Sequence, residues 1–119
     1  MKKTLVFGAS LKPHRYSNLV IKRLADNKIE TEAYGVKEGE TFCVQVKTKL
    51  EHFQNIHTIT LYLNPKRQAA YYESIIRLQP KRVIFNPGTE NPELYKLLKN
   101  NGIEVEIACT LVLLATGQY

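Results

Sequence analysis

The sequence predicts an α/β domain with a doubly wound, mainly parallel sheet of five or six strands and helices on both faces. Three observations support this prediction: short apolar segments recur along the chain, helical patterns lie between them, and a glycine turn directly follows the first apolar segment. Strands that alternate with helices need crossover connections, which make the strands parallel. With 119 residues, 44% hydrophobic and 24% charged, the chain fits one domain over residues 1–119, too short for separate cofactor and substrate domains.

The predicted strands differ in strength. Residues 28–36 form a weaker strand because Glu30, Thr31 and Glu32 interrupt its apolar pattern, and this polarity favours a position nearer the edge of the sheet. Residues 41–46 are short, and they fit either an edge strand or part of a loop. The strongly apolar segments, which we interpret as the remaining strands, cover residues 4–8, 56–63, 82–86 and 103–109.

Two of the predicted helices begin with the same dipeptide. Asn64-Pro65 and Asn91-Pro92 each place a capping side chain before a proline of the first helical turn. The first of these helices would end before Pro80, and Gly102 supplies a left-handed stop for the second.

The other predicted helices lie near the two ends of the chain. Ser17 is a candidate N-cap for a helix over residues 18–27, where Leu19, Val20 and Leu24 share one face. Residues 110–118 follow the last strand and are most simply a short covering helix.

The charge and the cysteines narrow the class of protein. Seventeen Lys and Arg residues against eleven Asp and Glu residues give a formal charge of +6, which favours polyanionic partners such as nucleotides, nucleic acids or anionic membrane surfaces. Only Cys43 and Cys109 occur, and no signal pattern precedes the first strand, so we expect a cytoplasmic protein with reduced thiols. No apolar run approaches the roughly 18 to 20 residues that a membrane-spanning helix needs.

The loop after the first strand is the main candidate site. In a doubly wound sheet, ligands bind beyond the carboxyl ends of the strands, where the strand order reverses. Gly8 can take the tight turn there, Ser10 adds a hydroxyl donor, and Lys12, His14 and Arg15 add positive charge. This combination predicts a phosphate-binding loop. The absence of further glycines argues against an ordinary dinucleotide fingerprint.

Three stretches of the chain resemble a known family: "TLVFGASLKPHRYSNLVIKRL", "LYLNP" and "RVIFNPGTENPELYKLLKNNGIEVEIAC". Together they resemble the small stand-alone CoA-binding proteins, whose Rossmann-like domain is similar to the CoA-binding domain of the succinyl-CoA ligase α subunit. The resemblance runs over residues 3–109. It is weakest over residues 34–56, where the family commonly has a Val-Asn-Pro turn and this chain has "YGVKEG".

The resemblance implies a CoA or acyl-CoA ligand at the carboxyl ends of the strands. Arg15 would approach the 3′-phosphate or the pyrophosphate, and Lys37 would reach the nucleotide's phosphate or ribose. The remaining implied contacts are a phosphate loop of Gly8, Ala9, Ser10, Lys12 and Pro13, a turn containing Val36, a middle loop of Leu63, Asn64 and Pro65, and a far wall of Asn86, Pro87 and Gly88.

Three functions remain open from the sequence. The first is a non-catalytic CoA-binding module, with no catalytic residue and no metal ligand assigned. The second is a small NAD(P)-dependent or acyl-CoA-dependent enzyme, disfavoured for NAD because Tyr34-Gly35-Val36-Lys37 offers no ribose-binding carboxylate. The third, a nucleic-acid-binding protein, is less favoured because Lys and Arg are spread over many elements. We expect a small-molecule nucleotide cofactor as the partner, with no nucleic acid and no membrane, and a protein partner stays open.

Overall fold

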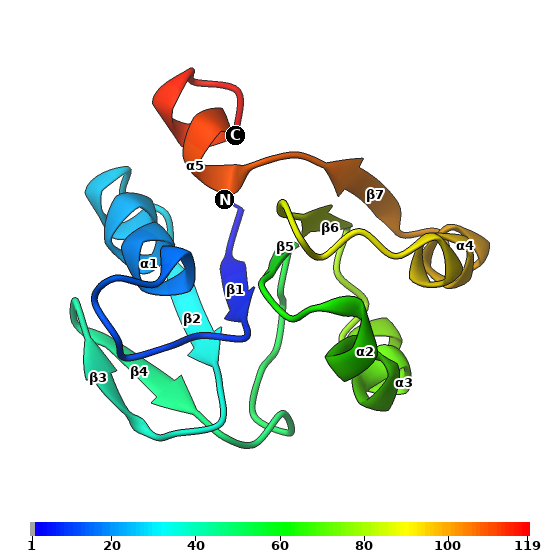
Figure 1. The fold of residues 1–119 in the computed structure, drawn as a ribbon, viewed down its shortest axis with the longest axis horizontal. Helices are drawn as coiled ribbons and strands as arrows, with labels where there is room; N and C mark the ends of the chain where they lie inside the picture. The colour runs from blue at the N-terminus through cyan, green and yellow to red at the C-terminus, as the bar shows by residue number, and fades with distance from the viewer. Residues whose placement is uncertain (1) are drawn as a thin grey trace.

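The computed structural model describes residues 2–119 and contains one seven-stranded sheet in the order β3-β4-β2-β1-β5-β6-β7. All neighbouring strands pair in parallel except β3 and β4. The predicted α/β fold is therefore confirmed (Figure 1), but the sheet has seven strands rather than the expected five or six, because residues 39–47 form the two strands of a hairpin. The elements in chain order are β1 (Thr4–Phe7), α1 (Tyr16–Asp26), β2 (Thr31–Tyr34), β3 (Gly39–Thr41), β4 (Val44–Lys47), β5 (Thr58–Leu61), α2 (Pro65–Gln68), a 3₁₀ turn (Ala69–Tyr71), α3 (Tyr72–Arg77), β6 (Arg82–Phe85), α4 (Pro92–Asn100), β7 (Glu104–Ile107) and α5 (Thr110–Ala115).

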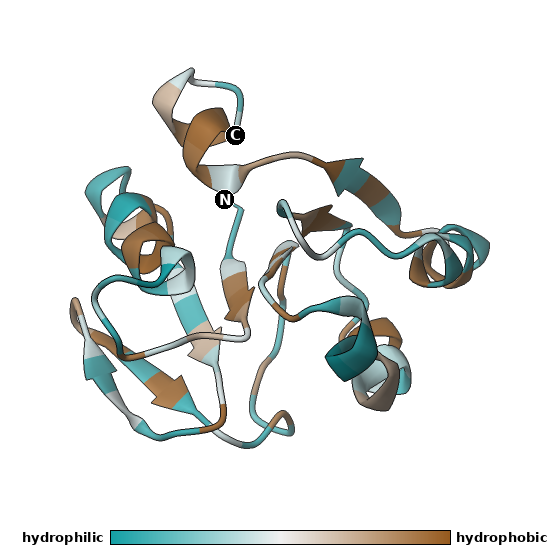
Figure 2. Ribbon diagram, viewed as in Figure 1, coloured by the Kyte–Doolittle hydropathy of each residue, from teal (hydrophilic) through white to brown (hydrophobic). Residues whose placement is uncertain are grey.

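Helices cover both faces of the sheet. Helices α1 and α5 lie on one face, and α2, α3 and α4 lie on the other (Figure 1). Because side chains alternate along a strand, Val6 belongs to the core under α1 while Leu5 and Phe7 belong to the core under α2, α3 and α4. Every residue of β1, β5 and β6 is buried, and the hydrophobic residues in Figure 2 follow these strands and the inward stripes of the helices.

The strand order reverses at β1, which positions the candidate site. The chain leaves β1 for β2 on one side and later returns to β5 on the other. The register pairs Phe7 with both Tyr34 and Leu61, and Leu61 with Phe85. The loops after β1, β2, β5 and β6 therefore leave the sheet at one edge, which we call the carboxyl edge.

The polarity of β2 predicted a position nearer the edge of the sheet. The structure instead places β2 in the interior, between β1 and β4. Its polar residues are tolerated because Lys3 lies 3.4 Å from Glu32 and 3.8 Å from Glu30, and because β4 pairs only with the carboxyl half of β2. The first half of β2 thus remains open along one side.

The short segment at residues 41–46 is a hairpin of two strands. Strands β3 and β4 pair antiparallel, and a tight turn at Phe42 and Cys43 joins them. Both residues adopt left-handed backbone conformations, with φ of 48° and 65°. Such hairpin turns usually carry Asn-Gly or Asp-Gly, so Phe-Cys gave no turn signal in the sequence.

Two helix predictions are confirmed and two need correction. The Asn64 and Asn91 side chains accept hydrogen bonds from the amides of Arg67 and Leu94, as expected of N-caps. Ser17, in contrast, is buried inside α1, which begins at Tyr16 without a side-chain cap.

The helix predicted after Asn64 is interrupted. It is divided into α2, a 3₁₀ turn and α3, because Tyr71 leaves helical geometry with φ −114° and ψ 4°. At this break the Tyr71 ring packs against Phe7, with the centroids 5.4 Å apart. The interruption therefore places an aromatic side chain against the end of β1.

Candidate ligand-binding site

The turn after β1 requires glycine at its first position. Gly8 has φ +98°, a conformation that other residues rarely adopt. A β-carbon on Gly8 would lie 3.1 Å from Leu63 Cδ2 and 3.2 Å from the carbonyl carbon of Tyr62. The tight turn predicted from the sequence is therefore present, and it packs directly against the loop after β5.

The backbone amides of this loop divide into two groups. The amides of Gly8 and Ala9 both donate to the Tyr34 carbonyl oxygen, at 2.9 Å and 2.8 Å. These two amides are thus hydrogen-bonded to β2. They are not available to a phosphate, although the predicted phosphate-binding loop includes both residues. Within residues 2–119, the amides of Ser10 and Leu11 have no hydrogen-bond acceptor. They are the donors that a bound anion could use.

The Asn18 side chain holds the same loop from below. Asn18 is 2% exposed, and its Nδ2 donates to the Ser10 carbonyl and to Thr41 Oγ1, both at 2.9 Å. Leu11 packs over Gly39, where a β-carbon would lie 2.5 Å from Leu11 Cδ1. The loop is therefore fixed between α1 and β3, and sequence reasoning missed Asn18 because its partners are 8 and 23 residues away.

Basic side chains extend from this fixed loop into solvent. Lys12, His14 and Arg15 are exposed, as is Pro13 between them. The turn after β2 leaves the same edge and exposes Lys37 beside Val36, which is 76% exposed. In the part of the chain that the structure describes, none of these lysine and arginine side chains forms an ion pair.

The loop after β5 has mixed burial. Leu63 is buried against Gly8, whereas Asn64 and Pro65 are exposed. The Asn64 side chain is engaged as the N-cap of α2, so its contribution to a ligand site would come from its backbone. Leu63 therefore packs the loop after β5 against the turn after β1.

Asn86 faces the interior of the protein. It is 2% exposed, and its Nδ2 donates to Thr60 Oγ1 at 2.8 Å and to the Leu61 carbonyl at 2.9 Å. Its Oδ1 accepts the amide of Thr110 at 2.9 Å. The side chain therefore ties β5, β6 and α5 together. In this loop, Pro87 and Gly88 are the exposed residues.

An aromatic cluster lies where β1 and β2 end. The Tyr34 ring packs against Phe7 at 4.9 Å and against Tyr71 at 5.8 Å between centroids. Burial, together with the neighbouring Tyr71 hydroxyl, raises the pKa of Tyr34 to about 12. A neutral phenol therefore stands at the end of β2, where dinucleotide enzymes place a carboxylate.

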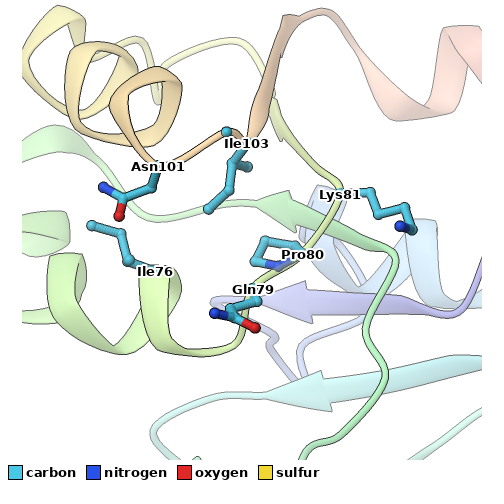
Figure 3. A pocket seen from close by; sticks show the side chains of 7 residues that line it. Ile76, Gln79, Pro80, Lys81, Asn101 and Ile103 are labelled. Carbon is cyan, nitrogen blue, oxygen red and sulfur yellow. The ribbon is translucent and has the colours of Figure 1, made fainter.

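Two hollows are lined by residues outside the predicted site. One of about 460 Å³ lies between the ends of α3 and α4, lined by residues that include Gln79, Lys81 and Ile103 (Figure 3). Another of about 410 Å³ is formed by α4 itself. Neither contains a predicted site residue.

Three further features concern metal binding, the cysteines and membrane-spanning helices. In residues 2–119, no three His, Cys, Asp or Glu side chains lie where they could share a metal ion. Cys43 is exposed and Cys109 is half-buried; both are free thiols. None of the helices in that range has the length and apolar character that crossing a membrane requires.

Comparison with known proteins identifies the family. A family model described as the CoA binding domain matches residues 2–115. This match spans nearly the whole chain, and the protein therefore belongs to the CoA-binding domain family. A search of curated proteins finds no match.

Solved structures share the fold. A crystal structure of an uncharacterized protein is 44% identical, with a TM-score of 0.96, over 100% of this chain and 98% of its own. A hypothetical protein from Pyrococcus horikoshii OT3 is 28% identical, with a TM-score of 0.84, over 93% and 80% of the two chains. A Thermus thermophilus protein that is 21% identical, with a TM-score of 0.88 over 99% and 90% of the two chains, has the same fold.

Proposed function

We propose that this protein is a non-catalytic binding module for CoA or an acyl-CoA, with the ligand phosphates against the loop between β1 and α1. One observation carries the proposal. At the point where the strand order reverses, the unengaged amides of Ser10 and Leu11 stand beside the exposed cations Lys12 and Arg15. An anion there would accept hydrogen bonds from fixed amides and gain charge-assisted contacts from mobile side chains.

The rest of the ligand would extend along the neighbouring loops. Val36 and Lys37 would contact the nucleotide, while the 63–65 segment and Pro87 with Gly88 would line the pantetheine arm. Asn86 would support this loop without touching the ligand through its side chain, because its side-chain amide is already hydrogen-bonded to Thr60, Leu61 and Thr110. CoA suits such a surface because one end is a highly charged nucleotide and the other is a long, nearly neutral arm.

Because the cations are exposed, each can contribute only a small free energy to ligand binding. Exposed ion pairs typically contribute only about 0.2–1 kcal/mol each, and salt screens them. We therefore expect the amides of the fixed loop to supply orientation, and Lys12, Arg15 and Lys37 to supply a salt-dependent share of the affinity.

The alternatives have less support. An NAD-dependent enzyme usually binds the ribose diol with a carboxylate at the end of the second strand, and Tyr34 followed by Gly35 does not supply one. A nucleic-acid-binding role would need a continuous basic stripe, whereas Lys22, Lys81 and Lys99 lie on separate elements or loops. We also propose a cytoplasmic location, in keeping with the two free thiols.

Thermal unfolding in the presence of different ligands tests this function. We expect CoA to raise the Tm clearly, dephospho-CoA to raise it less, and NAD or a short oligonucleotide to change it little. The double variant Ser10→Ala, Lys12→Ala should show a smaller CoA response while remaining folded. Lys99→Ala is the matched control and should keep the response. It removes an exposed lysine from the last turn of α4, outside the loops of the proposed site.

Two outcomes count against the proposal. Equal stabilisation by every polyanion would reduce the site to non-specific attraction. Turnover of an acyl-CoA by the purified protein, lost in the double variant, would show that the module is catalytic.

A further inference from the structure

The fully buried side chain of Gln68 joins two loops of the carboxyl edge. Its Nε2 donates to the Leu63 carbonyl at 2.7 Å, in the loop after β5. The same nitrogen donates to the Thr89 carbonyl at 2.8 Å, in the loop after β6. Both hydrogens of the amide are therefore used, one for each loop, in a residue with no exposed surface.

Asn91 extends this connection to the start of α4. Its Nδ2 donates to Gln68 Oε1 and to the Tyr72 hydroxyl, both at 2.8 Å, while its Oδ1 caps α4 through the amide of Leu94. Every polar atom of the Gln68 side chain thus has a partner. Leu63 lies in the loop after β5, whereas Thr89 and Asn91 both lie in the segment between β6 and α4. This set of contacts among Leu63, Gln68, Thr89 and Asn91 is the amide bridge.

The four residues of the amide bridge are buried, so the loss of one hydrogen-bonding partner is costly. A buried carbonyl that loses its donor still bears the full free-energy cost of desolvation. If Gln68 were absent, the Leu63 and Thr89 carbonyls would both lose this donor. Gln68 therefore links the two loops directly, beyond the point where the pairing of β5 with β6 and the Asn86 contacts end.

We propose that Gln68 is a positioning residue of the CoA site, one that fixes the loops after β5 and β6 relative to each other without touching the ligand. This inference rests on the proposed function, because the exposed residues of those loops are the proposed wall for the pantetheine arm. A site whose walls are fixed before binding loses less conformational entropy when the ligand arrives. Removing the bridge therefore lowers the affinity for CoA as well as the stability.

The first readout does not involve a ligand. In Gln68→Met, which keeps the length of the side chain but has no donor, we expect hydrogen exchange of the Arg67 and Thr89 amides to accelerate together. The amide of Gly35 donates to the Lys47 carbonyl, between β2 and β4, and serves as the internal reference, because its exchange should not change. Unchanged exchange at Arg67 and Thr89 would overturn the inference.

The second readout is affinity measured by titration calorimetry. We expect Gln68→Met to weaken CoA binding about tenfold, the scale of one lost ordering contribution. Val83→Ala, a buried substitution in the middle of the sheet, serves as a control for lost stability and should keep the affinity of the unmodified protein. Equal affinity in Gln68→Met and the unmodified protein, or equal losses in both variants, would overturn the inference.

A second variant covers failure of the first to fold. Asn91→Asp keeps the acceptor that caps α4 but removes the donor to Gln68 and Tyr72, so it should produce the same paired acceleration of exchange and a weaker CoA affinity. If the unmodified protein does not bind CoA, the proposed function fails. The exchange readout then still decides whether Gln68 couples the two loops.

Discussion

The carbonyl oxygen of Ala9 lies less than 3.0 Å from the point where a β-carbon on Gly35 would stand. This contact, with the hydrogen bonds from Gly8 and Ala9 to the Tyr34 carbonyl, joins the loop after β1 to the turn after β2. Two loops of the proposed site are therefore in backbone contact, and only glycine permits it at position 35.

Replacing Gly35 with alanine should damage both stability and binding. The new methyl group would meet a backbone carbonyl that cannot move without breaking the bonds to Tyr34, so we expect a loss of about 1–3 kcal/mol in the free energy of unfolding. Chemical denaturation measures this loss. Gly88→Ala, at an open position with φ +93°, should cost less, about 1 kcal/mol. A Gly35→Ala protein as stable as the original would contradict the contact.

Asn18 should matter for the shape of the first loop. Asn18→Leu removes the donor that serves the Ser10 carbonyl and Thr41 Oγ1, and it leaves a buried acceptor without a partner. We expect a destabilisation of about 1–3 kcal/mol and weaker CoA binding. Thermal unfolding and calorimetry check the two effects. Asn27→Leu, at an exposed position after α1, is the comparison and should leave CoA affinity as it is.

The cations of the first loop should act mainly through charge. Lys12→Ala and Arg15→Ala should each weaken CoA binding roughly two- to fivefold at low salt, since exposed pairs contribute about 0.2–1 kcal/mol. The difference between these variants and the unmodified protein should shrink at high salt, because salt screens exposed charges. Calorimetry at two salt concentrations measures it. A constant difference would indicate a role other than electrostatic attraction.

Tyr34 predicts loss of stability at alkaline pH. Its pKa rises from 10.0 in the unfolded chain to about 12 in the folded protein, chiefly through burial. A group with a raised pKa contributes stability that is fully present below pH 10 and is lost as the pH climbs towards 12. Denaturation as a function of pH should show this decline, with a smaller slope in Tyr34→Phe. An identical slope in the variant would mean that Tyr34 titrates as an exposed phenol.

The sequence was sufficient for the framework of the site. Strand positions followed from apolar segments, and Asn64 and Asn91 were identified as caps because the Asn-Pro pair acts locally. The Gly8 turn was predicted for the same reason. Since strand and helix alternate, the four loops could be assigned to one edge before their contacts were known.

The side-chain contacts of the site could not be predicted in this way. Asn86 was assigned to the ligand wall, yet its amide bonds to residues about 25 positions away in the chain. Gln68 looked like one polar residue of a helix, and only its burial between two loops reveals the bridge. Such contacts depend on which loops lie next to each other in the fold. A local pattern of residues does not predict that arrangement.

Mapping CoA onto the protein by NMR tests the central claim most directly. In a titration followed by amide shifts, we expect the largest changes at Ser10, Leu11 and Lys12, with smaller changes at Val36 and Gly88. Changes centred instead on Gln79 and Lys81, at the hollow beyond the opposite edge of the sheet, would contradict the account.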